Sequence, residues 1–182
     1  MIPALPIHLL GDFLLVSGDN PVTTVHVPRL QSLLAYLVLH RTAPQARSHL
    51  AFLMWPDSTE AQAHVNLRKA LHHLRQVLPD ADHFLHVDRQ SLQWQPSRSE
   101  APWTLDVQDF EQAIASSEQA VQVHDTKAMR QAFEQAVQLY RGDLLPSCYD
   151  EWILPERDRL HQLFLQASER LIVFLEEERD YV

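Results

Sequence analysis

One stretch of the chain, residues 59–78, carries side chains suited to reading a DNA groove. Its residues Leu67, Leu71, Leu74 and Leu78 recur at intervals of four, three and four, which predicts one buried face of a helix. The other face is rich in groups that neutralise phosphates or make paired hydrogen bonds to base edges. The predicted DNA contacts on this helix are Gln62, Val65, Asn66, Arg68, Lys69, His72, His73, Arg75 and Gln76.

The members of this set have different expected roles. The cations Arg68, Lys69 and Arg75 are expected to anchor phosphates, and Val65 could meet a thymine methyl group. Arg89, at the tip of a predicted hairpin, adds a phosphate or minor-groove contact. An ordinary solvated helix face is the alternative that the sequence leaves open. The predicted base readers are Gln62, Asn66, His72, His73 and Gln76.

Other chemistries have little support in the residue types. The chain has three glycines, too few for a glycine-rich phosphate loop, a dinucleotide fingerprint or a nucleophile elbow. The single cysteine, Cys148, excludes an internal disulfide. His72 and His73 are adjacent, so they project about 100° apart on a helix and are poorly placed to chelate one ion. We therefore expect no enzymatic activity, no metal and no cofactor.

The charge of the chain is divided unevenly between its halves. The formal net charge is −9, yet residues 1–100 carry eight Lys or Arg and eight Asp or Glu. Residues 101–182 carry seven basic and sixteen acidic residues, whereas residues 29–79 carry six and two. Such asymmetry predicts two modules with different partners. The basic segment suits DNA, and the acidic half suits a protein contact because it would repel DNA.

The elements expected before residue 98 have the order of a winged helix-turn-helix. In that geometry the third helix enters the major groove and the hairpin reaches the flanking backbone. Ser48 is the expected cap of the second helix, and Ser58 or Thr59 that of the third. The expected elements are strands at 5–16 (interrupted near Gly11) and 22–27, helices at 29–40, 48–54 and 59–78, and a hairpin of 84–87 and 92–94.

The second half is predicted to be helical throughout. It follows a polar linker with two prolines, residues 95–102, and its helices are expected at 107–121, 126–140 and 155–178. The paired helices are typical of helical repeats, with a partial tetratricopeptide match. The predicted fold is mainly α with a small β component, with a winged helix-turn-helix at 1–98 and tetratricopeptide-like helices at 103–182. The expected buried stripe of the last helix is Leu160, Leu163, Phe164, Ala167, Leu171, Phe174 and Leu175.

Several runs of residues carry a family resemblance. Residues 7–94 resemble the winged-helix domain of the Streptomyces antibiotic regulatory protein family, which is similar to OmpR-type DNA-binding domains. The matching runs are residues 30–39, His49–Asp57 and Ala63–Arg75. The second half resembles the bacterial transcriptional activator domain that follows in that family. The residues that carry this second likeness are Leu105–Phe110, Leu139–Pro146, Trp152, Glu156, Arg157 and Leu160.

The resemblance implies a bacterial DNA-binding transcription regulator. Such a protein would bind direct repeats of double-stranded DNA near promoters, self-associate there as side-by-side copies, and activate by recruiting RNA polymerase. The family's domain continues into further helix pairs, so the resemblance also implies a truncated piece of a larger regulator. A protein-interaction scaffold whose winged helix does not bind DNA, and an effector-binding sensor, stay open as alternatives.

The location expected from the sequence is the cytoplasm. No apolar run approaches the length that spans a bilayer, so no membrane contact is expected. The first residues lack the basic leader and apolar core of a signal peptide.

Overall fold

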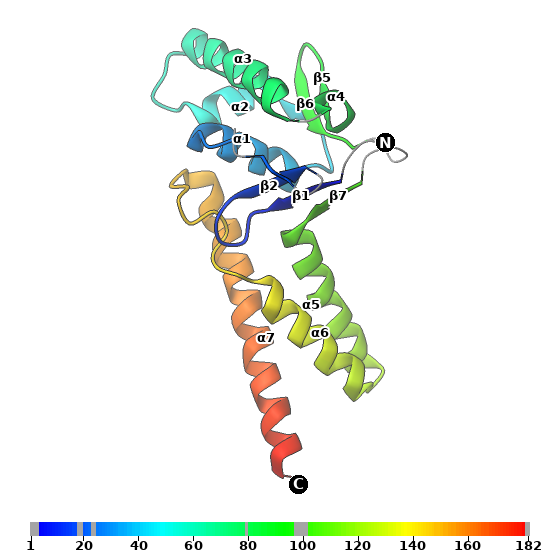
Figure 1. The fold of residues 1–182 in the computed structure, drawn as a ribbon. Helices are drawn as coiled ribbons and strands as arrows, with labels where there is room; N and C mark the ends of the chain where they lie inside the picture. The colour runs from blue at the N-terminus through cyan, green and yellow to red at the C-terminus, as the bar shows by residue number, and fades with distance from the viewer. Residues whose placement is uncertain (1–3, 18–19, 23–24, 79, 97–101, 181–182) are drawn as a thin grey trace. The chain divides into compact units, whose positions relative to one another are not determined.

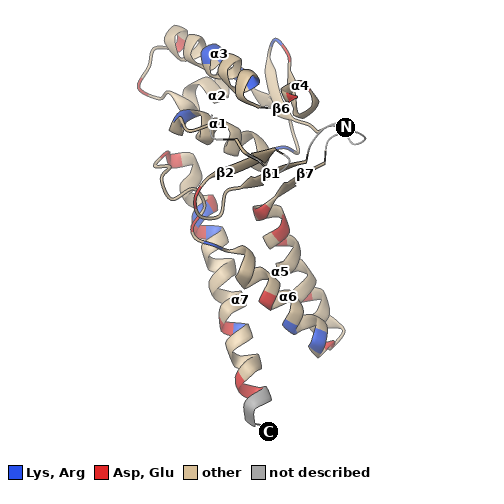
Figure 2. Ribbon diagram, in the orientation of Figure 1, with Lys and Arg blue, Asp and Glu red and all other residues tan. Residues whose placement is uncertain are grey.

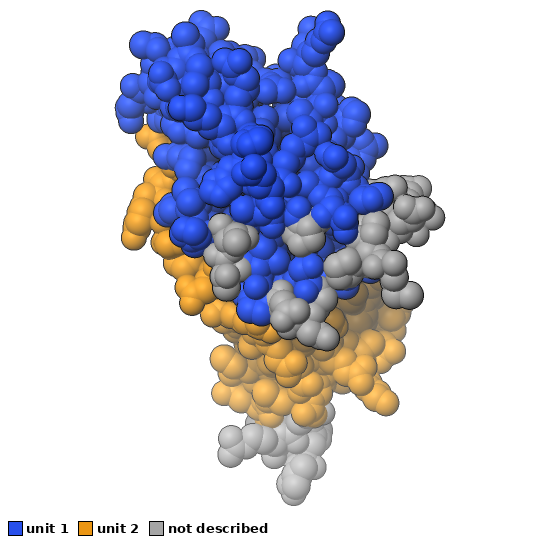
Figure 3. Space-filling view, turned by 45° about the horizontal axis from the view of Figure 1, so that its top comes forward, with its two compact units in different colours: residues 1–7, 14–103 blue, residues 8–13, 104–182 orange. Residues whose placement is uncertain are grey.

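The computed structural model describes residues 4–17, 20–22, 25–78, 80–96 and 102–180, and its fold is mainly α with a small β component (Figure 1). The chain forms two compact units, coloured separately in Figure 3. The first unit consists of residues 1–7 and 14–103, and the second of residues 8–13 and 104–182. None of the helices in the described part of the chain combines the length with the apolar character that a bilayer crossing requires.

Two small sheets occur in the described residues. One has the strand order β3-β2-β1-β7, and in it the amide of Leu5 donates to the carbonyl of Pro102 over 2.9 Å. The other has the order β4-β6-β5, with antiparallel pairing of both neighbours. The strands are β1 (Leu5–His8), β2 (Leu14–Ser17), β3 (Asn20–Pro21), β4 (Gln45–Ala46), β5 (Leu85–Val87), β6 (Ser91–Trp94) and β7 (Trp103–Leu105).

The most buried helix in the described part of the first unit is α1 (Pro28–Leu39), with eight buried residues among its twelve. Pro28 starts this helix because its missing N–H is one that no helix start would satisfy. The others are α2 (Arg47–Met54), α3 (Glu60–Val77) and the single turn α4 (Ala81–Phe84). Helices α1, α2 and α3, followed after the unpredicted turn α4 by the β5–β6 hairpin, have the order of a winged helix-turn-helix that the sequence predicted.

The expected strand at residues 22–27 is wrong for the residues that are described there. Val22 and Val25–Val27 lie outside any strand, and β3 is two residues long. Val25 is 2% exposed, and its carbonyl accepts a hydrogen bond from Nε2 of Gln31 at 2.9 Å. The segment is therefore held by a side chain of α1 rather than by a neighbouring strand.

Two further boundaries in the first unit differ from expectation. Ser48 does not cap α2, because β4 leads straight into the helix at Arg47 and Ala46 takes the capping position without a side-chain bond. The amide of Arg47 donates instead to the carbonyl of Gln90 over 2.8 Å. Phe84 ends α4 rather than starting a strand, and its ring stacks on Trp94 at 5.4 Å. Of the expected linker 95–102, residues 97–101 lie outside the described residues.

The second unit has the helices that the sequence predicted, shifted by one or two residues at most of their ends. Helices α5 (Asp106–Gln122) and α6 (Thr126–Leu139) form an antiparallel pair, and α6 also packs on α7 (Leu154–Asp180) (Figure 1). Asp125 caps α6, accepting from the amide of Ala128 at 3.0 Å. The 3₁₀ turn η1 (Glu151–Ile153), which was not predicted, precedes α7.

The expected buried stripe of α7 is only partly correct. Leu160 and Ala167 are buried, whereas Leu175 is 36% exposed and the other four residues of the stripe are half-buried. The reason is length: 27 residues of helix extend about 40 Å, and the 14 residues of α6 cover about half of that. The second half of α7 therefore keeps apolar surface open to solvent.

A buried carboxylate fastens residues 8–13 to the rest of the second unit. Asp106 is 6% exposed, and its two oxygens accept from the amides of Leu9 and Leu10 at 2.9 Å and of Val107 at 2.8 Å. Burial raises the pKa of this carboxyl, although the amides of Leu9 and Leu10 and the nearby His8 act in the opposite direction. The same segment bonds to the loop after α6, where the amide of Gly11 donates to the carbonyl of Asp143 over 3.0 Å.

Substitution of Gly11 is expected to destabilise this junction. Its φ of +90° is strained for any residue with a side chain, and a Cβ on Gly142 would lie 3.3 Å from its Cα. We expect Gly11→Ala to lower the free energy of unfolding by about 1–3 kcal/mol, measured by urea denaturation at 25 °C. Asp12→Ala, on the exposed neighbour, is the control. Equal stability of Gly11→Ala and the unmodified chain would contradict the positive φ.

Candidate nucleic-acid interface

Helix α3 is held by a cap at one end and by a buried stripe along its length. Oγ1 of Thr59 accepts a hydrogen bond from the amide of Gln62 at 3.4 Å. Glu60, in the first turn, interacts favourably with the positive end of the helix dipole. Leu67, Leu71 and Leu74 are 4% exposed or less, which confirms the predicted core face. The orientation of α3 is therefore set by its leucines, and its opposite face is turned outward.

None of the nine predicted contact residues of α3 is buried. Val65 and Asn66 are half-buried, because they border the core stripe. The blue segments of α3 in Figure 2 mark its cations. The exposed members are Gln62, Arg68, Lys69, His72, His73, Arg75 and Gln76.

Two interactions on this face distinguish its members. Nε2 of Gln62 donates to Oδ1 of Asn66 at 2.8 Å, so these two amides already lie together one helical turn apart. Nη2 of Arg75 lies 2.8 Å from Oδ1 of Asp82, an exposed ion pair that neutralises this arginine. The sequence did not reveal this pair, because Asp82 lies in α4, an element too short to show a period.

The tip of the β5–β6 hairpin is shaped by one aspartate. Asp88 accepts from the amides of Gln90 and Ser91 at 2.6 Å and from the hydroxyl of Ser91 at 2.7 Å. The Ser91 hydroxyl and the two amides lower the pKa of Asp88, so the carboxylate form that holds the turn is favoured. Arg89 lies in this turn with its side chain exposed.

Arg47 is a positioning residue that the sequence reasoning missed. Its guanidinium donates to the carbonyl of Asp88 over 3.0 Å, and its amide donates to the carbonyl of Gln90 over 2.8 Å. It therefore ties the first turn of α2 to both sides of the hairpin tip. The signal present in the sequence was a basic residue at the start of a short helix, but nothing there showed its partner 41 residues away.

The arrangement leaves three cations available to a polyanion. Arg68, Lys69 and Arg89 form no ion pair with any other residue that the structure describes. Figure 1 shows α3 and the hairpin at the same end of the first unit. Over the same described residues, no three His, Cys, Asp or Glu side chains are grouped so that they could hold a metal ion. The exposed groups of α3 and the hairpin can neutralise the charge of a polyanion and form hydrogen bonds with it.

Comparisons with known proteins bear on both units. Residues 105–178 match the family model of the bacterial transcriptional activator domain. The solved structure of Mycobacterium tuberculosis EmbR in complex with a low affinity phosphopeptide matches 93% of this chain, with a TM-score of 0.66 and 16% identity. The match spans 43% of that longer chain. No curated protein matches. The chain thus shares the mainly helical fold of the EmbR structure, and its second unit is similar to a bacterial transcriptional activator domain.

Proposed function

We propose that this chain is a transcription regulator that binds double-stranded DNA through α3 and the β5–β6 hairpin. The observation that carries the proposal is the exposed face of α3, where Arg68 and Lys69 are unpaired in the described structure and the Gln62–Asn66 amide pair lies beside them. Arg89 at the hairpin tip supplies a third cation. The cations would neutralise phosphates, and the amide of Gln62 or Asn66 would read adenine in the major groove through two hydrogen bonds.

The other predicted contacts have graded roles in this proposal. His72, His73 and Gln76 are exposed and would reach base edges, while the half-buried Val65 would meet a thymine methyl group. Arg75 would reach a phosphate only by exchanging its bond to Asp82 for one to DNA. Arg75 is therefore the weakest of the proposed anchors.

The second unit is proposed to contact RNA polymerase. The similarity of residues 105–178 to the bacterial transcriptional activator domain supports activation as the outcome. The excess of acidic over basic residues after residue 100 supports a protein partner, because such a surface is repelled by the DNA that the first unit would hold. Side-by-side copies on repeated half-sites would place several such units at one promoter.

A salt titration tests DNA binding and the role of Lys69 together. We expect a duplex of random sequence and about 30 base pairs to bind at low salt. The logarithm of the binding constant should fall linearly with the logarithm of the salt concentration. Lys69→Ala should flatten that slope by about one unit, and Lys127→Ala, an exposed lysine on α6, should leave it unchanged. Fluorescence anisotropy is the measurement.

The same titration separates the proposal from a scaffold that does not bind DNA. The zero net charge of residues 1–100 is what favours the scaffold. Absence of duplex binding at low salt, or binding insensitive to salt, would decide for it. An unchanged slope in Lys69→Ala would remove Lys69 from the phosphate contacts.

A further inference from the structure

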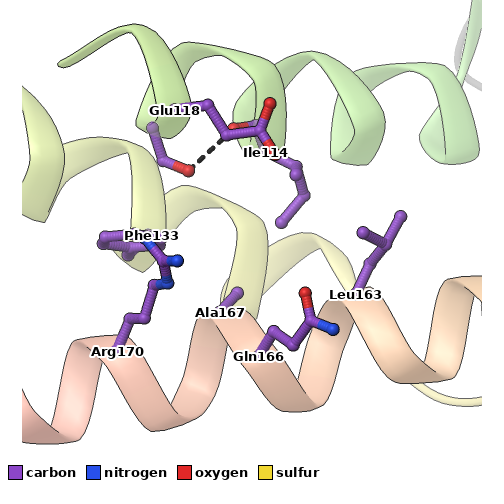
Figure 4. A pocket seen from close by; sticks show the side chains of 8 residues that line it. Ile114, Glu118, Phe133, Leu163, Gln166, Ala167 and Arg170 are labelled. Carbon is purple, nitrogen blue, oxygen red and sulfur yellow. Dashed lines mark hydrogen bonds between the residues drawn. The ribbon is translucent and has the colours of Figure 1, made fainter. Parts of the chain in front are cut away.

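A groove runs along α7 in the second unit. It consists of two hollows that share Phe133 of α6 and Arg170 of α7 in their linings. The smaller has a volume of about 40 Å3 and lies between α5 and α7, with Ile114 and Ala167 on opposite sides (Figure 4). The larger has a volume of about 400 Å3 and extends to Phe174. We call the two hollows together the α7 groove.

The floor of the α7 groove is apolar, and the groove is open to solvent on one side. Phe133 is 4% exposed, Met129 and Phe174 are half-buried, and Val173 is 53% exposed. A small ligand is usually enclosed over most of its surface, which an open groove does not provide. An elongated apolar groove is instead typical of sites that receive the apolar face of a helix.

The rim of the α7 groove is acidic. Among the described residues, its lining includes Glu118, Glu169 and Glu177 and one cation, Arg170. None of these three carboxylates forms an ion pair with another described residue. The three glutamates and Arg170 together give the rim a net charge of −2. An occupant that complements this rim therefore carries positive charge.

We propose that the α7 groove binds a basic amphipathic helix of a partner protein. The apolar face of that helix would cover Phe133, Val173 and Phe174, and its Lys or Arg side chains would reach the glutamates of the rim. The part of α7 between Leu163 and Glu177 extends about 21 Å, the length of four turns of a bound helix. The inference rests on the proposed function only in taking the second unit to be a protein-contacting unit.

A synthetic peptide of leucines and lysines, with the leucines at helical spacing, is the probe. The full chain should bind its fluorescein conjugate at least about 10-fold more tightly than the same peptide with glutamates in place of lysines. A peptide of the same composition with alternating leucines, which cannot form an apolar helix face, should bind weakly. Fluorescence anisotropy at moderate salt gives the affinities.

Two neighbouring residues supply a matched pair of variants. Val173 and Ile172 are 53% and 55% exposed, but Val173 lines the groove and Ile172 does not. Val173→Gln should weaken binding of the lysine peptide about 5-fold, and Ile172→Gln should leave it unchanged. Glu169→Lys combined with Glu177→Lys, both exposed, should reverse the preference toward the glutamate peptide.

The outcomes that overturn the inference are distinct from a failure of DNA binding, which the duplex titration measures separately. Equal losses in Val173→Gln and Ile172→Gln would place the peptide on another face of α7. Loss of binding in step with self-association, seen by sedimentation, would assign the groove to a second copy of the chain. Absence of saturable binding of the lysine peptide by a chain that still binds duplex would remove the site altogether.

Discussion

Replacing Arg68 and Lys69 together by glutamate is expected to weaken duplex binding about 100-fold at 100 mM salt. Both side chains are exposed on α3 and unpaired in the described structure. Each lost phosphate contact removes roughly one released counterion, which is worth about 8-fold at this salt concentration, and the new carboxylates add repulsion. The measurement is duplex affinity by fluorescence anisotropy, with circular dichroism to verify that the helix content is unchanged.

The control for this double variant changes the same net charge elsewhere. Lys127→Glu with Arg170→Glu reverses two exposed cations on α6 and α7. It should weaken duplex binding only slightly, through the long-range field of the protein. If both double variants lost affinity equally, net charge rather than the face of α3 would determine binding, and the proposed interface would be wrong.

Asp106→Ala is expected to lower the free energy of unfolding of the second unit by about 3–5 kcal/mol. The substitution leaves the buried amides of Leu9, Leu10 and Val107 without their acceptor, and each unsatisfied group costs about 1–3 kcal/mol. Urea denaturation followed by circular dichroism measures the loss. Hydrogen exchange at Leu9 and Leu10, expected to accelerate, locates it.

Asp109→Ala is the matched control for this variant. Asp109 lies in the same first turn of α5, but it is exposed, so its removal tests the effect of the helix dipole alone. We expect a loss of about 0.5 kcal/mol there. A comparable loss in both variants would mean that the buried bonds of Asp106 contribute nothing of their own.

The stability difference between the unmodified chain and Asp106→Ala should also depend on pH. Burial raises the pKa of Asp106 in the folded state above its unfolded value of about 3.9. The folded state then binds this proton more readily than the unfolded state. The difference should therefore be largest below the unfolded pKa and decrease as the pH rises through the folded pKa. A difference that grows with pH over this range would contradict the raised pKa.

The parts of the interface that the sequence predicted are those with a local signal. The spacing of Leu67, Leu71 and Leu74 predicts which side of α3 is buried, and hence which residues are exposed, without knowledge of what covers it. Ser58 or Thr59 before an acidic first turn predicts where the helix starts, and the cap in the structure is Thr59. The pairing of helices α5 and α6 follows from two amphipathic segments of similar length joined by a short connection.

The parts that the sequence did not predict depend on distant partners. Strand β4 has two residues, too few to alternate, and exists because Gln45 and Ala46 pair with Leu92 and Ser91. The role of Arg47 follows from that pairing. Asp106 resembles any acidic residue at a helix start, and two of its amide donors, Leu9 and Leu10, are 97 and 96 residues away. The exposure of Leu175 reflects the unequal lengths of α6 and α7, which periodicity does not record.

The assignment of residues 8–13 to the second unit has consequences for the order of folding during synthesis and for recombination between related genes. These residues leave the ribosome early, yet the carboxylate that receives their amides is synthesised only after about 100 further residues. The second unit cannot complete its folding until the first has been translated in full. Recombination at a single point near residue 100 would separate Asp106 from its donors, so a functional exchange between relatives must transfer both segments.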